Sequence, residues 1–205
     1  MSHERTGECR IRRISTTVST KIDYADDAEI DATLDELPDE ETLDETVRNL
    51  EANGFEVVVV DAAEDALETI RSESPVGASV MNGHSTTLEE VGFDEYLSEG
   101  EHDWEGLPER IRSIDDDQKR QAARRDSQTA DYFVGGINAV SGTGELVAAD
   151  LSGGRIGAYP FAAGNVLIVT GTNKIVPPLD DALDRLESVA YPLENERAQE
   201  PTAPS

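Results

Sequence analysis

The chain has 205 residues, with 44 acidic and 17 basic side chains and a formal net charge of −27 at pH 7. A field of this sign repels nucleic-acid phosphates, so the composition argues against a DNA- or RNA-binding protein. The single cysteine, Cys9, excludes a disulfide framework, a cysteine-ligated zinc site and an iron–sulfur cluster held by this chain alone.

The acidic residues occur in the segments expected to be helical as well as near both ends, and only three lysines accompany fourteen arginines. Concentrated salt screens the self-repulsion of such a surface, so we interpret the charge as an adaptation to a salty cytoplasm. An ordinary acidic protein with disordered tails is the alternative. No apolar run approaches the roughly 18 to 20 residues that span a bilayer, and no signal-peptide pattern is present. We expect a cytoplasmic protein without a membrane span.

The two ends of the chain lack sustained periodicity. Residues 1–35 begin with a basic patch and continue into an acidic stretch, and residues 193–205 end in AQEPTAPS. We therefore expect a poorly ordered extension over 1–35, one domain over 36–192 and a disordered tail over 193–205.

The first expected helix begins at Pro38–Asp39 and ends at Gly54. Its apolar face consists of Leu43, Val47 and Leu50. Residues 55–60 (FEVVVV) are β-branched without alternation, which predicts a strand covered on both faces. A second helix, to about Ser72, is expected to start with a capping box of Asp61 and Glu64.

The remaining elements alternate between strands and helices. A short strand is expected over 78–81, a helix from Thr86, and helical structure over 104–127. Strands are then predicted near 132–135, 145–149, 155–159 and 166–170. The last helix is expected to pack through Leu179, Leu183, Leu186 and Val189. This order predicts an α/β layered fold with a largely parallel sheet.

Residues 131–176 hold nine of the sixteen glycines and few charges. A segment this apolar within so acidic a chain must be mostly buried, while its glycines let the backbone turn tightly or approach another group closely. Together these features predict core strands with a ligand crevice at the edge of the sheet.

Four segments resemble a known family: NGHSTTLEEVGF (82–93), ADYFVGGINAVSGTGELVAAD (130–150), GGRIGAYPFAAGNVLIVTGTNKIV (153–176) and DDALDRLESVAYPLENER (180–197). The sequence resembles the LUD domain (lactate utilisation domain) family of the LutC or YkgG type, in a haloarchaeal-like form. The likeness covers residues 36–197.

The resemblance implies a Rossmann-like α/β fold of the NagB/RpiA/CoA-transferase group, with a mostly parallel sheet flanked by helices. It also implies a link to the oxidation of L-lactate to pyruvate, beside iron–sulfur subunits of the LutB or LutA type. This chain has no cluster-binding motif and so resembles the short, cluster-free component. The resemblance implies no particular cofactor and leaves open whether the chain is itself an enzyme.

The first candidate site is Gly135, Gly136 and Asn138, directly after a predicted buried strand. Ligands of open α/β sheets bind beyond the carboxyl ends of the strands, where two glycines would let the backbone approach a small anionic ligand. The alternative is a tight strand exit in which Asn138 ties down a neighbouring loop.

Two carboxylates are candidates for acid–base catalysis. Glu145 follows an expected hairpin turn, and Asp150 leads into a loop containing Gly154 and Arg155, which could bind a ligand. The alternative for Asp150 and Arg155, which explains them equally well, is an ion pair between them that holds the loop closed.

Lys174 is the strongest single candidate, because a chain with three lysines places one just after a core strand. Its compact ammonium, next to Thr172 and Asn173, is suited to an anion. The alternative is a structural salt bridge to Asp150 or Glu145.

Asn82, Gly83, His84 and Ser85 follow another short strand and precede a helix, whose N-terminus favours anions. His84 could transfer protons. The alternative is an ordinary loop histidine, with Ser85 or Thr86 capping the helix together with Glu89.

No spacing is diagnostic of a metal site, a P-loop, a serine-hydrolase elbow or a dinucleotide-binding loop. Three functions therefore remain: an accessory subunit of a lactate-oxidising assembly, a stand-alone enzyme acting on a small phosphorylated or carboxylated metabolite, and a non-catalytic metabolite sensor.

Overall fold

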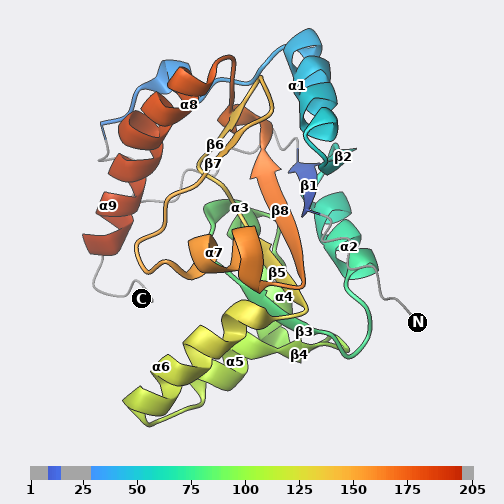
Figure 1. The fold of residues 1–205 in the computed structure, drawn as a ribbon, viewed down its shortest axis with the longest axis vertical. Helices are drawn as coiled ribbons and strands as arrows, with labels where there is room; N and C mark the ends of the chain where they lie inside the picture. The colour runs from blue at the N-terminus through green and yellow to red at the C-terminus, as the bar shows by residue number, and fades with distance from the viewer. Residues whose placement is uncertain (1–8, 15–28, 200–205) are drawn as a thin grey trace.

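The computed structural model describes residues 9–14 and 29–199, and its centre is a six-stranded parallel sheet (Figure 1). The strand order is β2-β1-β8-β5-β3-β4, and every pairing is parallel. The strands are β1 (Cys9–Ile14), β2 (Glu56–Val60), β3 (Ser79–Asn82), β4 (Glu105–Gly106), β5 (Tyr132–Gly135) and β8 (Asn165–Gly171).

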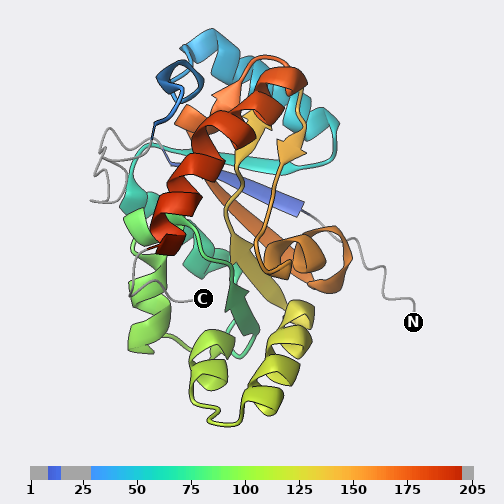
Figure 2. The same cartoon turned by 90° about the vertical axis from the view of Figure 1, so that its left-hand side faces the viewer.

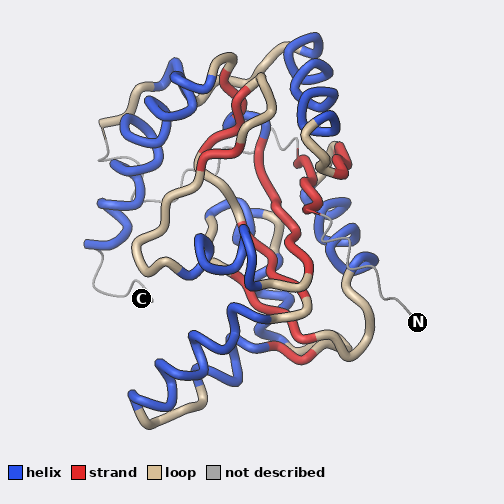
Figure 3. The backbone as a smooth tube through the Cα atoms, viewed as in Figure 1, coloured by secondary structure: helices blue, strands red, loops and turns tan. Residues whose placement is uncertain are grey.

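A second, three-stranded sheet lies near the carboxyl end of β8 (Figure 3). It contains β6 (Ala139–Ser141), β7 (Leu146–Val147) and β9 (Ile175–Val176). β6 and β7 form the predicted antiparallel hairpin, in which Gly144 has a φ of +94°. β6 pairs in parallel with β9, which brings the residues after β8 beside those after β5.

Helices flank the parallel sheet, so the predicted α/β fold class is confirmed. In Figure 1, α1 and α2 lie on the opposite side of β8 from α8 and α9, while α5 and α6 lie at the end near β3 and β4. The helices are α1 (Glu40–Ala52), α2 (Ala63–Glu73), α3 (Thr86–Glu90), α4 (Phe93–Glu99), α5 (Leu107–Arg112), α6 (Asp117–Asp126), α7 (Gly154–Gly157), α8 (Leu179–Arg185) and α9 (Tyr191–Gln199). One turn of π-helix joins α8 to α9, and the two run in line (Figure 2).

β8 is covered on both faces, because its successive side chains point to opposite sides of the sheet. Leu167 and Val169 join a cluster with residues of α2, α3 and α4, and Val166 and Ile168 join another with Leu50 of α1. This arrangement accounts for the uninterrupted apolar sequence of β8.

The first helix forms as its sequence predicts. The Asp39 carboxylate accepts a hydrogen bond from the Thr42 N–H at 2.8 Å and caps α1. Leu43 and Leu50 are buried, and Gly54 follows the helix with a φ of +91°. The strands predicted at 78–81, 132–135 and 166–170 are confirmed as β3, β5 and β8.

Parts of both ends of the chain form regular secondary structure. Residues 9–14, within the predicted poorly ordered extension, form β1 between β2 and β8, and residues 32–34 form a 3-10 turn. At the other end, α9 continues to Gln199, into the predicted tail. Residues 1–8, 15–28 and 200–205 lie outside the described residues.

Two expectations about the first βα unit are wrong. β2 is not buried on both faces, because none of its five residues is fully buried and Val59 is 42% exposed. The predicted capping box is absent, because α2 begins after Ala62, and no side chain makes the capping hydrogen bond there.

Two later expectations are also wrong. The strand predicted at 155–159 is helical, since α7 covers Gly154–Gly157 and one π-helical turn follows. In α8, Leu179 and Leu183 are exposed at 38% and 46%, and the buried face contains Ala182 and Arg185.

Candidate functional site

The carboxyl ends of β3, β5 and β8 meet at one edge of the sheet. Asn82 of β3 lies opposite Val134 of β5, and Gly135 of β5 lies opposite Ile168 of β8. Because the strands are parallel, the loops that follow them emerge on the same side. The predicted convergence of residues 82–85, 135–138 and 172–174 is therefore present. We call this group, together with Asp150 and Arg155, the carboxyl-edge cluster.

Lys174 links its own segment to α3 and to the loop after β5. Its Nζ donates hydrogen bonds to the Thr87 Oγ1 at 2.9 Å and to the Ile137 carbonyl at 3.2 Å. The residue keeps some exposed area, but its ammonium end lies deep. Burial, followed by the nearby Arg185 charge, lowers the pKa of Lys174 from 10.5 to about 8, while Glu90 and Asp35 oppose the shift. The ammonium thus reaches the backbone of the loop after β5, one residue before Asn138.

Arg155 and Asp150 form an ion pair, as the structural alternative to a catalytic role for Asp150 predicted. The Arg155 Nε lies 3.2 Å from the Asp150 Oδ2, and the Arg155 guanidinium also donates to the Ala149 and Gly136 carbonyls at 2.9 Å and 3.4 Å. The pair thus fastens the loop after β7 to the loop after β5.

Asp150 also explains why the next residues are helical rather than extended. Its carboxylate accepts backbone hydrogen bonds from Ser152, Gly153 and Arg155, which serve as a cap for α7. Burial raises the pKa of Asp150, but these hydrogen bonds and the Arg155 charge outweigh it, so the net pKa is lowered. The carboxylate stays ionised near neutral pH and cannot donate a proton there; its predicted catalytic role stays a prediction.

Glycines are required in this cluster because side chains of the protein approach the backbone closely. A Cβ on Gly136 would overlap the Ser85 Oγ, one on Gly135 would overlap the Tyr159 hydroxyl, and one on Gly83 would lie 2.5 Å from the Arg155 Cγ. Internal packing therefore accounts for these three glycines.

Asn138 ties down a neighbouring loop, as the alternative interpretation proposed. Its Oδ1 accepts a hydrogen bond from the Ala149 N–H at 2.8 Å, and its backbone N–H donates to the Val147 carbonyl at 3.0 Å. Its own carbonyl accepts a hydrogen bond from Arg185.

Arg185 and Asp35 belong to the site but were missed in the sequence. The Arg185 guanidinium is paired with the Asp35 carboxylate, which also accepts a hydrogen bond from the Asn173 Nδ2 at 2.9 Å. One signal was available, since Arg185 shares a helix face with Ala182 and Val189, both buried. No sequence pattern indicated Asp35, which lies 150 positions away from Arg185.

The loop after β3 places its residues in different directions. The Asn82 Nδ2 donates to the Asp94 carboxylate at 2.6 Å, in α4. The His84 Nδ1 lies 3.3 Å from the Glu89 carboxylate. Burial lowers the pKa of His84, the Arg197 charge lowers it further and Glu194 opposes the shift, so the imidazole is mainly neutral at pH 7. Ser85 is the N-cap residue of α3 but makes no side-chain capping bond.

The sequence model of the LUD domain matches residues 43–204. The chain belongs to the LUD domain family. Among curated proteins and solved structures, none matches this chain. The matched stretch includes every predicted site residue, whereas Asp35 and β1 precede it. Within the described parts of this LUD protein, no helix combines the length and apolar character needed to cross a bilayer.

Glu145 lies apart from the carboxyl-edge cluster of the LUD domain. It is exposed at the tip of the β6–β7 hairpin, whose Gly144 carbonyl accepts a hydrogen bond from Asn53 at the end of α1, at 2.9 Å. Hydrogen bonds, first from Thr143 and then from Ser141, lower the pKa of Glu145. Its predicted catalytic role is untested, but its position gives that role no support.

The remaining two candidates lie at the start of short helical turns. Gly154 is the first residue of α7, and Thr172 is buried where the chain leaves β8. Both therefore shape the backbone of the cluster.

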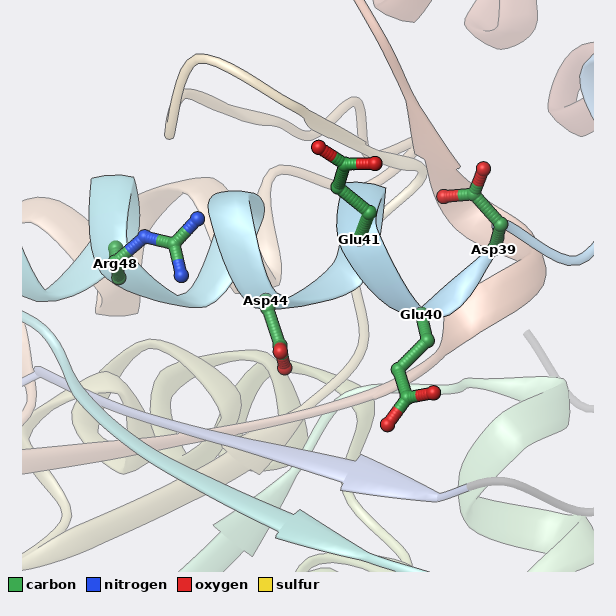
Figure 4. A pocket seen from close by; sticks show the side chains of 5 residues that line it. All are labelled: Asp39, Glu40, Glu41, Asp44 and Arg48. Atoms are coloured by element: carbon green, nitrogen blue, oxygen red, sulfur yellow. The ribbon is translucent and has the colours of Figure 1, made fainter.

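Two surface hollows lie along α1. One is bordered by acidic side chains of the first turns, where Asp39 and Glu41 extend to one side of the helix and Glu40 and Asp44 to the other (Figure 4). The other is mainly apolar, lies between α1, β2 and the end of β8, and borders the carboxyl-edge cluster at Thr172. Among the described residues, no group of three histidine, cysteine or carboxylate side chains is placed to hold a metal ion.

The buried Lys174 predicts a pH-dependent stability. Its folded-state pKa of about 8 lies below 10.5, so the unfolded chain binds more protons between these values and stability rises with pH. Between pH 7 and pH 9, the free energy of unfolding of the natural protein should rise by about 1 kcal/mol relative to Lys174→Met. Urea unfolding of both proteins at both pH values, in the same salt, measures this difference.

Lys119→Met provides the control, because Lys119 is exposed on α6. Its difference from the natural protein should be the same at both pH values. A pH-independent difference for Lys174→Met as well would show that the ammonium is not buried as described.

Proposed function

We propose that this LUD-domain protein is a cluster-free accessory subunit of an assembly that oxidises L-lactate to pyruvate, and that the carboxyl-edge cluster binds a small anion. Membership of the LUD family supports a context of lactate utilisation. The placement of Lys174 is the observation that supports the anion site most strongly.

Three cationic side chains, those of Lys174, Arg155 and Arg185, donate to carbonyls of the loop after β5. They do so in a protein whose net charge is −27. The Arg185 and Arg155 charges lower the pKa of Lys174, because like charges disfavour its protonated form. An anion bound there would favour the protonated form and offset this repulsion. Thr87 and Ile137 accept two of the three ammonium N–H donors, and no hydrogen bond among the described residues uses the third.

The redox group that accepts the electrons would have to be supplied by a partner protein. The chain's one cysteine cannot ligate an iron–sulfur cluster by itself. Within this proposal, iron–sulfur subunits of the LutB or LutA type accept the electrons, and the LUD-domain subunit supplies an anion-binding surface.

Affinity-tagged protein isolated from its native host in molar KCl tests the proposal. We expect the eluate to contain iron and to reduce a dye in an L-lactate-dependent reaction. Lys174→Met should retain the iron but lose at least tenfold in the lactate-dependent rate, while Lys119→Met should retain both. An eluate without iron would refute the assembly.

One observation favours a second candidate, a stand-alone enzyme acting on a small phosphorylated or carboxylated metabolite. A lysine whose pKa is about 8 can exchange protons near neutral pH. Turnover of such a substrate by the purified chain alone, abolished by Lys174→Met, would support this function. Binding of a metabolite without turnover would instead support a sensor.

A further inference from the structure

Arg185 is a buried cation whose hydrogen-bonding capacity is incompletely used. Its side chain is 4% exposed. One terminal nitrogen, Nη1, donates to the Asn138 carbonyl, and the other, Nη2, donates to the Asp35 carboxylate. Its Nε is buried and has no hydrogen-bond partner among the described residues. A buried donor without a partner is costly, so this nitrogen indicates a place for a further acceptor.

The geometry of the guanidinium identifies the kind of acceptor. Nε and Nη2 lie on the same edge of the planar group and form a fork that matches the two oxygens of a carboxylate. Asp35 uses only one oxygen, Oδ1, for both Arg185 Nη2 and Asn173 Nδ2. The fork is therefore half filled.

The segment that carries Asp35 is lightly attached. It contains a 3-10 turn, Ala32–Leu34, in which no residue is fully buried. A backbone hydrogen bond of 3.0 Å joins the Asp31 N–H to the Ser188 carbonyl, and Leu34 packs at the edge of an apolar cluster with Ala182. The segment precedes the residues matched by the family, whereas Asn173 and Arg185 lie within them. Displacing it would expose little apolar surface.

We propose that Arg185 and Asn173 form a subsite for the carboxylate of a small organic acid, and that Asp35 is an intramolecular substitute which such a ligand displaces. Arg185 would hold both ligand oxygens through Nε and Nη2, and the Asn173 amide would donate to one of them. The subsite adjoins Lys174, so it defines the ligand class of the anion site proposed above and rests on that proposal for its biological role. Its binding chemistry depends on Arg185 and Asn173 alone.

The proposal predicts that removing the internal competitor improves binding. Acetate serves as the probe, acetamide as its uncharged counterpart, and KCl keeps the ionic strength constant. In the purified chain, Asp35→Ala should bind acetate at least tenfold more tightly than the natural protein, and acetate should raise its melting temperature in proportion to ln(1 + [L]/Kd). Acetamide should do neither.

Glu36→Ala is the matched control, because it removes an equal charge from the exposed neighbouring position. It should bind acetate as the natural protein does. Adding Asn173→Ala to Asp35→Ala should reverse most of the gain. Equal acetate affinity in Asp35→Ala and Glu36→Ala, or equal effects of acetate and acetamide, would overturn the proposal.

The same test holds if Asp35→Ala is unfolded in KCl. Refolding in acetate but not in acetamide would support the subsite, and failure to refold in acetate would contradict it. Because the purified chain is tested without partner subunits or lactate turnover, the outcome is independent of whether the lactate-oxidising assembly exists.

Discussion

Arg185→Ala is expected to lower the free energy of unfolding by about 3 kcal/mol, the largest loss of any charged side chain in the carboxyl-edge region. The residue is 3% exposed, and its removal leaves the Asp35 carboxylate without its cation and the Asn138 carbonyl without a donor. Asp35 retains 31% exposure, so water recovers part of the loss. Urea unfolding in molar KCl measures the change.

The control is Arg112→Ala. Arg112 pairs with Glu109, and the two side chains are 64% and 48% exposed, respectively. An exposed ion pair contributes at most about 1 kcal/mol. If the two variants lost equal stability, Arg185 would not be a buried, paired cation.

Phe133→Ala is expected to cost about 4 kcal/mol, because it removes a large side chain that is 1% exposed at the centre of β5. Its ring packs edge-on against Tyr159, with centroids 5.7 Å apart. Tyr159 in turn donates a hydrogen bond to the Gly136 carbonyl at 2.8 Å. We therefore expect the cavity to loosen the carboxyl-edge cluster, visible as faster amide hydrogen exchange in residues 149–155.

Phe161→Ala makes the same chemical change at a side chain that is 93% exposed. Its effect on the free energy of unfolding should stay within about 0.5 kcal/mol. A loss comparable to that of Phe133→Ala would mean that Phe161 is covered in solution, for example by another molecule.

The parts of the fold that follow from local pattern could be predicted from the sequence. The apolar runs of β5 and β8 identify strands buried on both faces, and the glycine-rich loops after them identify the carboxyl edge. The contact of Lys174 with the loop after β5, at the Ile137 carbonyl, then follows from the parallel arrangement.

Other features depend on partners far away in the sequence. β1 has the sequence CRIRRI, and it is a strand because β2 and β8 pair with it on either side. Arg185 is buried because Asp35, 150 residues away, pairs with it. Residues 154–157 are helical because the Asp150 carboxylate accepts hydrogen bonds from the Gly153 and Arg155 N–H groups at the start of the helix. Local propensity cannot report interactions of this kind.

The position of β1 determines how far the N-terminus of this protein can be truncated without disrupting the sheet. Among the described strands, β1 alone joins β2 to the rest of the parallel sheet. A chain trimmed to the family boundary at residue 43 would therefore leave β2 detached from β8, with both facing edges unpaired. Open edges of this kind recruit strands from other molecules. The unit to express for crystallisation or ligand screening is therefore longer than the homologous region suggests.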